Sequence, residues 1–597
     1  MSLYKDASLA MIPSAYKDGK LYSIRPTDGS GDFTFSRGSN LAATRVDVNG
    51  LIEKGRENLF LNSSDLSAST WRDNAGVSTA NATTAPDGSN NAIKFIPNSA
   101  TTFHYVHHDT PISVINGGVM CFSIYVKRAG YDYVLLNTSQ GSSNGNAGPV
   151  IDLVNGKVVN NYVYTYDVTI ETAGNDWWRV SYYYKTSGTL TNVDFNVLPS
   201  SSITAYSGDG TSGVFMWGAQ LEQGLVATDY IETGASTAQA GILEDMPRLD
   251  YSGGASCPSL LLEPQRTNSV LHSEYYAGYP QTRITLTHNA ATSPEGVNNA
   301  TKMVETTDTG LHFLSLNGSV TSSSNVAFSI FAKQGENQFL QVLFGTGQTS
   351  PEAYANVDLS NGTYNDYNMV SFDTEDYGNG WYRIFGVVNP SVTSLGFYIA
   401  SVQSKTAARA ETYTGDGVSG FYLYGGQIES SASYPTSYIP TYGSSVTRSF
   451  DNAGTRTDMQ DFLGTDTGAW FMHLDEFYFD ITGTGLGSII LAENGQQAIS
   501  IELIQDGQFQ YKITLNNSTA ISNLDGEDKL IMNWSSEFFK IFINGVESYS
   551  STSSQWSNAF THLILPQTTR APHIKIKQML FFPTALTDSE CIALTTL

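Results

Sequence analysis

The sequence predicts an all-β chain of several domains, and three observations carry this prediction. The composition is rich in Gly, Ser, Thr, Asn and Tyr, which is typical of short strands joined by many turns. Segments with long helical periodicity are absent almost everywhere. A passage that reads as a Gly-Asp-Gly turn, an aromatic-rich strand and a closing Tyr-Ile occurs twice, at 206–231 and 413–439. The 597 residues are too many for one hydrophobic core, so the two passages indicate two copies of one β-domain.

Residues 1–57 form an N-terminal segment with Gly/Asp turns, which ends in a hairpin-like passage at 43–59. Parallel passages return at 247–268 and, shortened, at 446–451. Each stands just before a new domain, so we interpret them as hairpin connectors, the middle one spanning 241–267. We expect arginines to form a structural brace across the hairpins: Arg45 with Asp47 or Glu53, and Arg248 with Asp250 or Glu263.

Two repeats lie between the connectors, at 58–240 and 268–450. Short motifs match between them at a nearly constant spacing: 86–94 with 294–302, 122–127 with 328–333, 151–156 with 357–362, and 174–180 with 378–384. The third pair ends in Asn-Gly, a strong signal for a tight hairpin turn. Strand signals at roughly 8–12-residue intervals favour a jelly-roll-like β-sandwich for each repeat.

Residues 451–597 carry a different strand pattern and predict a third β-sandwich. A new strand begins at 468–475, and a last strand spans 573–582. Thr587 and Glu590 then have the spacing of a capping box, which predicts a short terminal helix.

The net charge of −25 argues against a nucleic-acid partner, because proteins that bind nucleic acid show basic clusters and none is present. No apolar run is long enough to span a membrane, so we expect no membrane insertion. Cys121, Cys257 and Cys591 are far apart and odd in number, and they imply no disulfide framework. The first residues lack the basic and apolar regions of a signal peptide, so we expect synthesis in a cytoplasm.

The last domain resembles the concanavalin-like, laminin-G-like sandwich. Three segments carry this resemblance: the Asn-Gly hairpin at 541–546, the strand at 576–582, and Leu-Thr-Asp-Ser-Glu at 586–590. The resemblance implies a laminin-G-like fold for 451–597, and it implies a fold more than a function.

The first two thirds of the chain resemble structural and fibre-type proteins of tailed bacteriophages. The segments that carry this resemblance are 33–39 with 43–46, 260–268, and 425–429 with 437–441. The resemblance implies a virion protein of a tail or head fibre or appendage, made in the host cytoplasm. It also implies sandwich modules that bind host surface glycan, other virion proteins as partners, and assembly as a homo-oligomer, a trimer.

Tandem aromatic residues are the candidate carbohydrate-binding residues: Trp177 and Trp178 in the first repeat, and Trp381 and Tyr382 in the second. An aromatic ring packs well on the apolar C–H face of a sugar. Neighbouring residues of a strand point to opposite faces, so one member of each pair is expected in the core, and core packing is the alternative for both. The arginine after each pair is predicted to bridge to a carboxylate of a neighbouring strand: Arg179 and Arg383.

A His-rich cluster is the candidate for metal binding: His104, His107, His108 and Asp109. A metal site needs ligands that converge on one point, whereas alternation places these side chains on two strand faces. The second repeat keeps His312 but has Ser315 in place of His107, so the shared histidine is expected to be structural. We predict no metal site and no cofactor; a Ca²⁺ ion in a loop of the last domain stays an open alternative, which no motif supports.

Glu476 and Asp480 are the nearest candidates for a glycosidase-like pair, because they share a strand face with Tyr478. Their spacing does not match the expected signature, and 475–480 reads as an ordinary opening strand. No phosphate-binding loop, nucleophile elbow or Cys/His pairing is recognised. No catalytic residue is therefore assigned.

These patterns lead to the hypothesis of a non-catalytic phage structural protein that contacts host surface carbohydrate, with 1–57 as the virion-attachment segment. Two alternatives stay open. One is a glycan-depolymerising tailspike enzyme, which would show two facing carboxyl groups in a cleft. The other is a purely architectural decoration protein that binds only other virion proteins.

Overall fold

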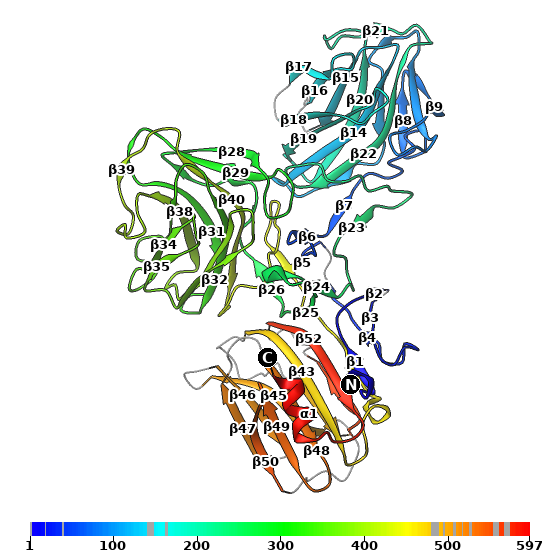
Figure 1. Ribbon diagram of the computed structural model, residues 1–597. Helices are drawn as coiled ribbons and strands as arrows, with labels where there is room; N and C mark the ends of the chain where they lie inside the picture. Colours follow the sequence, from blue (N-terminus) through cyan, green and yellow to red (C-terminus); the bar gives the residue numbers. More distant parts are fainter. Residues whose placement is uncertain are drawn as a thin grey trace.

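The computed structural model describes residues 3–17, 19–38, 41–139, 148–161, 165–478, 489–493, 496–505, 509–515, 518–523, 528–552, 560–565 and 573–596. In these residues the strands form three β-sandwiches around a central group of short connector strands (Figure 1). The predicted all-β, multi-domain sandwich architecture is confirmed. Within the described part of the chain, no helix is long and apolar enough to cross a membrane.

The first sandwich consists of two antiparallel sheets, of six and seven strands (Figure 1). One sheet has the order β9-β10-β22-β14-β19-β18: β9 (Gly76–Thr83), β10 (Ala92–Pro97), β22 (Gly213–Gln223), β14 (Val119–Ala129), β19 (Trp178–Lys185) and β18 (Thr165–Thr172). The other has the order β8-β12-β20-β15-β16-β17: β8 (Trp71–Asn74), β12 (Tyr105–His108), β20 (Leu190–Leu198), β15 (Tyr133–Ser139), β16 (Pro149–Asp152) and β17 (Lys157–Asn161). The seventh strand of this sheet is β13 (Ile112–Ser113), which pairs with β20, and at the rim β11 (Thr101–Thr102) pairs with β21 (Tyr206–Ser207).

The second sandwich repeats both strand orders. Its first sheet is β28-β29-β40-β32-β37-β36: β28 (Ile284–Ala291), β29 (Ala300–Glu305), β40 (Gly420–Ser430), β32 (Val326–Gln334), β37 (Trp381–Val388) and β36 (Ser371–Asp376). Its second sheet is β27-β31-β38-β33-β34-β35: β27 (Gln281–Thr282), β31 (His312–Ser319), β38 (Ser394–Val402), β33 (Phe339–Phe344), β34 (Tyr354–Asp358) and β35 (Tyr364–Tyr367). A rim pair joins β30 (Thr309–Gly310) to β39 (Tyr413–Thr414). The sequence repeat is thus a repeat of one topology.

The third sandwich lies at the C-terminal end. Its larger sheet contains β52 (His573–Phe582), β43 (Gly468–Tyr478), β48 (Asp528–Trp534), β49 (Phe539–Ile543) and β50 (Val546–Ser551). Its smaller sheet contains β42 (Thr455–Arg456), β51 (His562–Ile564), β44 (Ile489–Glu493), β45 (Gln496–Gln505), β46 (Phe509–Leu515) and β47 (Ser518–Asn523). The helix α1 (Asp588–Thr595) follows β52, and its predicted capping box is confirmed, with Thr587 N donating to Glu590 Oε2 at 2.8 Å.

Three strands from outside 451–597 complete the larger sheet: β1 (Leu9–Met11), β24 (Arg248–Asp250) and β25 (Ser259–Leu262). β25 pairs with 574–576 and β1 with 579–581, so together they cover one edge of β52, while β43 pairs with the other edge. An uncovered edge of this length would expose a row of unpaired main-chain groups. Segments that we expected to connect domains therefore form part of the third sandwich.

The remaining short elements belong to the connectors: β2 (Tyr16–Lys17), β3 (Lys20–Leu21), β4 (Phe33–Thr34), β5 (Thr44–Val46), β6 (Ile52–Lys54), β7 (Arg56–Asn58), β23 (Ala238–Ala240), β26 (Arg266–Asn268) and β41 (Val446–Arg448). β5 and β6 form a hairpin, β7 pairs with β23, and β26 pairs with β41. The described residues also contain four short 3₁₀-helices: Leu3–Lys5, Ser252–Gly254, Tyr276–Gly278 and Met459–Asp461. The β7–β23 pair ties the N-terminal segment to the end of the first repeat, and the β26–β41 pair joins the two ends of the second repeat.

A fully buried group of charges, which we call the central ion cluster, joins these segments: Arg37, Arg248, Glu263, Arg448 and Asp451. Arg248 and Arg448 each place Nη1 2.7 Å from Glu263 Oε2. Arg37 Nη1 lies 3.0 Å from Asp451 Oδ1, and Arg248 also contacts Asp451. The predicted brace between Arg248 and Glu263 is confirmed, and its burial makes it part of a larger network.

His573 connects the central ion cluster to the third sandwich. Its Nδ1 lies 2.9 Å from Glu263 Oε1 and its Nε2 lies 3.1 Å from Glu476 Oε2. Burial would lower the pKa of His573, but its hydrogen bonds to the two carboxylates raise this pKa above its ordinary value. Burial would raise the pKa of Glu263, but Arg448 and Arg248 hold it well below the ordinary value.

The substitution Asp451→Asn should destabilise the protein by about 3–5 kcal/mol, because it leaves buried guanidinium groups without a counter-charge. Urea unfolding followed by tryptophan fluorescence measures this change. Asp475→Asn is the matched control, since Asp475 forms a partly exposed pair with Lys577 at 3.3 Å and its loss should be worth less than about 1 kcal/mol. Equal effects of the two substitutions would contradict a structural role for the cluster.

Stability should also decline on both sides of a mildly acidic window. The depressed pKa of Glu263 contributes stability that is lost as pH falls below its ordinary value of 4.5. The raised pKa of His573 contributes stability that is present below 6.5 and lost as pH rises through the folded-state pKa. In urea midpoints measured across pH, the gap between wild type and His573→Gln should be widest below pH 6.5 and narrow above it.

His272→Gln is the control of opposite sign for this pH dependence. Burial lowers the pKa of His272 to about 4. The wild-type protein should therefore lose stability relative to the His272→Gln variant as the pH falls from 6.5 towards 4. Parallel pH curves for wild type and His573→Gln would disprove the role given to His573.

Candidate functional site

Two of the four predicted aromatic residues lie in the core. Trp177 is 1 % exposed and Trp381 is 2 % exposed. Their Nε1 atoms donate to main-chain carbonyl oxygens, of Thr84 at 3.1 Å and of Thr292 at 3.0 Å. A sugar-stacking role for Trp177 and Trp381 is therefore wrong, because neither ring has a face open to a ligand.

Trp178 and Tyr382, the other members of the pairs, are half-buried against hairpin turns. Each ring lies beside the glycine of the Asn-Gly turn in its own repeat, Gly156 and Gly362, both with positive φ. A Cβ atom at Gly156 would lie 2.4 Å from the Trp178 ring, and one at Gly362 would lie 2.5 Å from the Tyr382 ring. Both rings thus cover hairpin turns, and carbohydrate binding by them stays a prediction.

The His-rich cluster does not converge on one point. His104 places its two ring nitrogens against the carbonyl oxygens of Ala75 and Tyr206, at 2.6 and 2.9 Å. His108 is buried and contacts the carbonyl oxygen of Thr110, whereas His107 contacts Asp194 on the other face of the strand. Among the described residues, no group of three or more candidate ligands could hold a metal ion.

The shared histidine of the second repeat is structural, as the sequence predicts. His312 contacts the carbonyl oxygens of Arg283 and Tyr413, at 2.8 and 3.3 Å, which repeats the arrangement of His104. In both repeats this ring links the strand to the rim pair that precedes the Gly-Asp-Gly turn.

Glu476, one of the two carboxylates considered for catalysis, is an ion-paired residue. Burial would raise its pKa, but His573 and Lys575 lower the pKa to about 2. Lys575 Nζ lies 2.9 Å from Glu476 Oε1. Asp480 lies outside the described residues, so the structure does not test the pair.

The twice-repeated closing passage is a structural latch. Gln220 and Glu222 of β22 accept hydrogen bonds from the main chain of Ile231 and Thr228, at 2.7 and 2.9 Å. In the second repeat, the same bonds run from Ile439 to Gln427 at 2.7 Å and from Thr436 to Glu429 at 2.8 Å. These bonds hold the chain against the sandwich where it leaves each repeat.

The arginines after the aromatic pairs belong to this latch. Arg179 donates to the carbonyl oxygen of Thr228, and Arg383 donates to that of Thr436. The prediction of a carboxylate partner was wrong, because the chain that leaves each repeat places a main-chain carbonyl oxygen at the guanidinium group instead.

A row of polar side chains crosses the outer face of the sheet β8-β12-β20-β15, and it is exposed to different degrees, from Asn137 at 5 % to Arg72 at 57 %. We call it the polar row: Arg72, His107, Asp194 and Asn137. These residues stand opposite one another in register, and they alternate with core residues such as Val106 and Phe195. The row therefore faces away from the core.

Contacts within the polar row fix its side chains. His107 Nδ1 contacts Asp194 Oδ1, and Asn137 Nδ2 donates to Asp194 Oδ2 at 3.4 Å. The side chains of His107 and Asp194 are 16 % and 21 % exposed. The ring of Tyr105 lies 6.4 Å from that of His107 in an edge-on arrangement. The row thus combines hydrogen-bonding groups with an adjacent aromatic ring.

The same face of the second sandwich is filled. Ser315, Tyr398 and Leu343 take the register positions of His107, Asp194 and Asn137. Tyr398 stacks on the ring of Phe313 at 4.9 Å, and Leu343 is buried. The two copies share the strand order but present different chemistry on this face.

A covering segment closes the rest of that face. Gln341, Asn356 and Asn365, which stand in one row across the sheet, donate to main-chain carbonyl oxygens within 403–412. The acceptors are Ala408 at 3.0 Å, Ala407 at 2.8 Å and Lys405 at 3.0 Å. The second sandwich therefore uses its outer amides to hold its own chain.

The connectors line a wide, solvent-open pocket of about 420 Å³, which we call the connector pocket. Its lining comes from the N-terminal segment, the β5–β6 hairpin and the strand β24 with the residue that follows it: Ser14, Ala15, Tyr16, Arg45, Asp47, Val48, Glu53, Leu249 and Tyr251. The predicted pair across the first hairpin is confirmed here, with Arg45 Nη2 2.7 Å from Glu53 Oε2. The volume is in the range of small-molecule sites.

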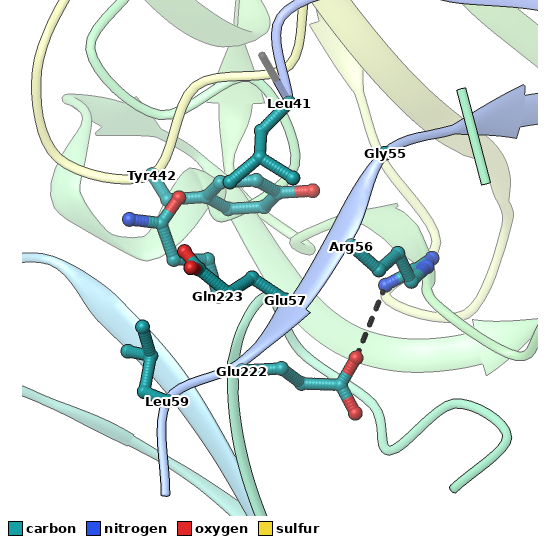
Figure 2. A pocket seen from close by; sticks show the side chains of 8 residues that line it. All are labelled: Leu41, Gly55, Arg56, Glu57, Leu59, Glu222, Gln223 and Tyr442. Carbon is teal, nitrogen blue, oxygen red and sulfur yellow. Dashed lines mark ion pairs between the residues drawn. The ribbon is translucent and has the colours of Figure 1, made fainter. Parts of the chain in front are cut away.

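A smaller pocket of about 40 Å³ lies where β7, the first sandwich and Tyr442 meet (Figure 2). Arg56 and Glu222 point toward each other across it, with 3.6 Å between Nη1 and Oε2, and the Tyr442 ring lies beside Leu41 (Figure 2). The space has room for water molecules rather than a sugar ring.

A second buried ion network adjoins this small pocket. Lys54 Nζ lies 2.7 Å from Glu274 Oε1 and 2.8 Å from Glu295 Oε2, and it donates to the Tyr442 hydroxyl at 2.6 Å. Arg56 also contacts Glu295. Because Glu222 belongs to the first sandwich and Glu274 and Glu295 belong to the second, the network fixes both to the connector.

No family model and no curated protein sequence matches the chain. Among solved structures, the crystal structure of the LG1-3 region of the laminin alpha2 chain matches with 10 % sequence identity and a TM-score of 0.15. The match covers 80 % of this chain and 95 % of that chain. A TM-score this low carries no argument about the arrangement of the domains or about function.

The contact between Tyr382 and its hairpin turn can be tested with two glycines. Gly362 and Gly378 share a φ of 74°, so alanine should strain both main chains by about 1–2 kcal/mol. Only Gly362 lies against a ring, while a Cβ at Gly378 would meet nothing within 4 Å. Gly362→Ala should therefore cost about 1–3 kcal/mol more than Gly378→Ala in urea unfolding.

The double variant Gly362→Ala/Tyr382→Ala isolates the ring contact. The extra loss at Gly362 should disappear when Tyr382 is also replaced, because the clash is then gone. An equal loss at Gly362 and Gly378 in the presence of Tyr382 would show that the ring does not pack on the turn.

Proposed function

We propose that this chain is a non-catalytic structural protein of a phage particle, in a tail or head fibre or appendage, that contacts host surface carbohydrate through its first sandwich. The phage setting rests on the sequence motifs that resemble fibre-type proteins. Other virion proteins and further copies of the chain, as a trimer, are the proposed partners. The proposal places the protein in the virion.

The observation that carries the carbohydrate contact is the difference between the two repeats on one face. In the first sandwich these positions carry polar groups, with the side chains of His107 and Asp194 16 % and 21 % exposed beside Tyr105, whereas the second sandwich has Tyr398 and the buried Leu343 there. Fixed carboxylate, amide and imidazole groups next to an aromatic ring suit the hydroxyl groups and apolar face of a sugar. Neither the fold nor the latch explains why one copy keeps these groups.

The bracing of the domains supports a mechanical role. Two buried ion networks, around Lys54 and around Arg248, hold the sandwiches on the connector. A rigid arrangement suits an appendage that must present one face at a fixed orientation, and it lowers the conformational entropy lost on binding.

The test is affinity electrophoresis of the full chain against purified surface polysaccharides from a panel of bacteria, with polysaccharide length measured in the same samples. The wild type should be retarded by at least one polysaccharide without shortening it. His107→Ala and Asp194→Ala should each weaken retardation by about tenfold, which corresponds to one lost charged hydrogen bond. Ser315→Ala, the equivalent position in the second sandwich, should have no effect.

The other outcomes separate the alternatives. Shortened polysaccharide would overturn the non-catalytic assignment in favour of a depolymerising tailspike. Absence of retardation across the panel would favour the architectural decoration protein. Retardation that is unchanged in both His107→Ala and Asp194→Ala would remove the polar row from the proposal.

A further inference from the structure

The connector pocket contains polar atoms that have no hydrogen-bond partner among the described residues. Arg45 places both Nε and Nη2 on the same oxygen of Glu53, Oε2, at 2.8 and 2.7 Å. Glu53 Oε1 and Arg45 Nη1 therefore have no hydrogen bond to the described residues, and neither has the hydroxyl of Tyr251. These three groups form a donor and acceptor set at the wall of a preformed space.

The charges of the connector pocket favour a neutral ligand. Arg45 and Glu53 neutralise each other. The third charged group, Asp47, is engaged by its own turn, where Oδ1 accepts from the main chain of Asn49 and Leu51, at 2.8 and 2.9 Å. An anionic ligand would meet the uncompensated charge of Asp47 and would have to displace Glu53 from Arg45.

The apolar part of the lining suits a ring with a C–H face. Tyr16 and Tyr251 are half-buried, and Leu249 is buried behind them. Arg45 lies 6.0 Å from the centre of the Tyr16 ring, which holds the guanidinium and the ring on the same wall. Tyrosine rings beside hydrogen-bonding groups are the combination that binds a molecule with hydroxyl groups on its edge and an apolar face.

The connector pocket is also rigid. Tyr251 N donates to Val46 O at 3.0 Å, and Val46 N donates to Asp250 Oδ1 at 2.9 Å. These bonds fix the β5–β6 hairpin to the strand that carries Tyr251, so the walls from two parts of the chain keep their spacing. A ligand would find the site already formed.

The second hairpin shows that the fold does not require the Arg45–Glu53 pair to be accessible. Arg248 and Glu263 hold the corresponding positions in the second hairpin, where both are completely buried in the central ion cluster. The Arg45 and Glu53 side chains are 14 % and 32 % exposed and face the cavity. The first hairpin keeps the same ion pair but leaves one edge of it accessible.

We propose that the connector pocket is a binding site for one neutral saccharide ring, separate from the polar row of the first sandwich. The Arg45–Glu53 pair and the Tyr251 hydroxyl take the sugar hydroxyl groups, and the tyrosine rings contact its C–H face. This proposal is argued only from contacts in the connector pocket and does not depend on carbohydrate binding by the first sandwich.

Saturation-transfer NMR and titration calorimetry of the full chain test this site with the methyl glycosides of glucose, galactose, mannose and N-acetylglucosamine. At least one should bind at millimolar concentration, and methyl glucuronide should bind more weakly than the matching glucoside because of its charge. Tyr251→Ala and Glu53→Gln should each weaken binding by about tenfold. Glu53→Gln keeps the shape of the side chain, so it reports on the site even if Tyr251→Ala unfolds.

Two controls separate this proposal from the polar row. Tyr22→Ala removes an exposed tyrosine of the N-terminal segment outside the pocket and should leave binding unchanged. His107→Ala should also leave binding of the methyl glycosides unchanged. Absence of binding by all four glycosides, or binding that is insensitive to both pocket variants, would overturn the proposal. Loss of binding in His107→Ala alone would assign the sugar to the polar row instead.

Discussion

The central ion cluster is the interaction on which the arrangement of the chain depends. Arg37, Arg248, Glu263, Arg448 and Asp451 have no contact with solvent, and they come from the N-terminal segment, the middle connector and the chain after the second sandwich. Burying five charges is unfavourable unless each has its counter-charge in place. The cluster is therefore satisfied only when all three segments are assembled together. Because His573 of the third sandwich contacts Glu263, the third sandwich must also be in place for the cluster to be complete.

The two repeats show which residues the fold requires and which it leaves free. Both keep a histidine at the rim, a buried tryptophan after the turn and a Gln and Glu that hold the exit segment. Asn58 and Asn268 donate to the carbonyl oxygens of Ile231 and Ile439, both at 2.8 Å. Two places differ between the copies. The outer face carries His107 and Asp194 in the first copy and Ser315 and Tyr398 in the second, and the Arg45–Glu53 pair is partly exposed whereas the Arg248–Glu263 pair is buried.

Local patterns predicted much of this structure. The repeat, the Asn-Gly turns, the capping box and the pairs Arg45–Glu53 and Arg248–Glu263 all depend on residues close in sequence, or on comparison of the copies. The alternation of side chains along a strand predicted that one aromatic residue of each tandem pair lies in the core. It could not predict which of the two, because burial depends on where the opposing sheet packs. The partners of Arg179 and the strands β1, β24 and β25 were missed for a related reason. Their pairing is long-range, and no local pattern specifies it. The connector pocket is built from three separate segments, so no single stretch of sequence indicates it.

The covering of β52 by β1 has a consequence for biosynthesis. Ser8 hydrogen-bonds to Phe581, 573 residues later in the chain. At about 5–20 residues per second, the ribosome needs roughly half a minute to two minutes to make that distance. During this interval the two repeats can fold as they emerge, while Leu9 and Met11 have no sheet to join. The third sandwich therefore closes only after translation has reached its last strand, and until then both β1 and β25 lack the strand with which they pair.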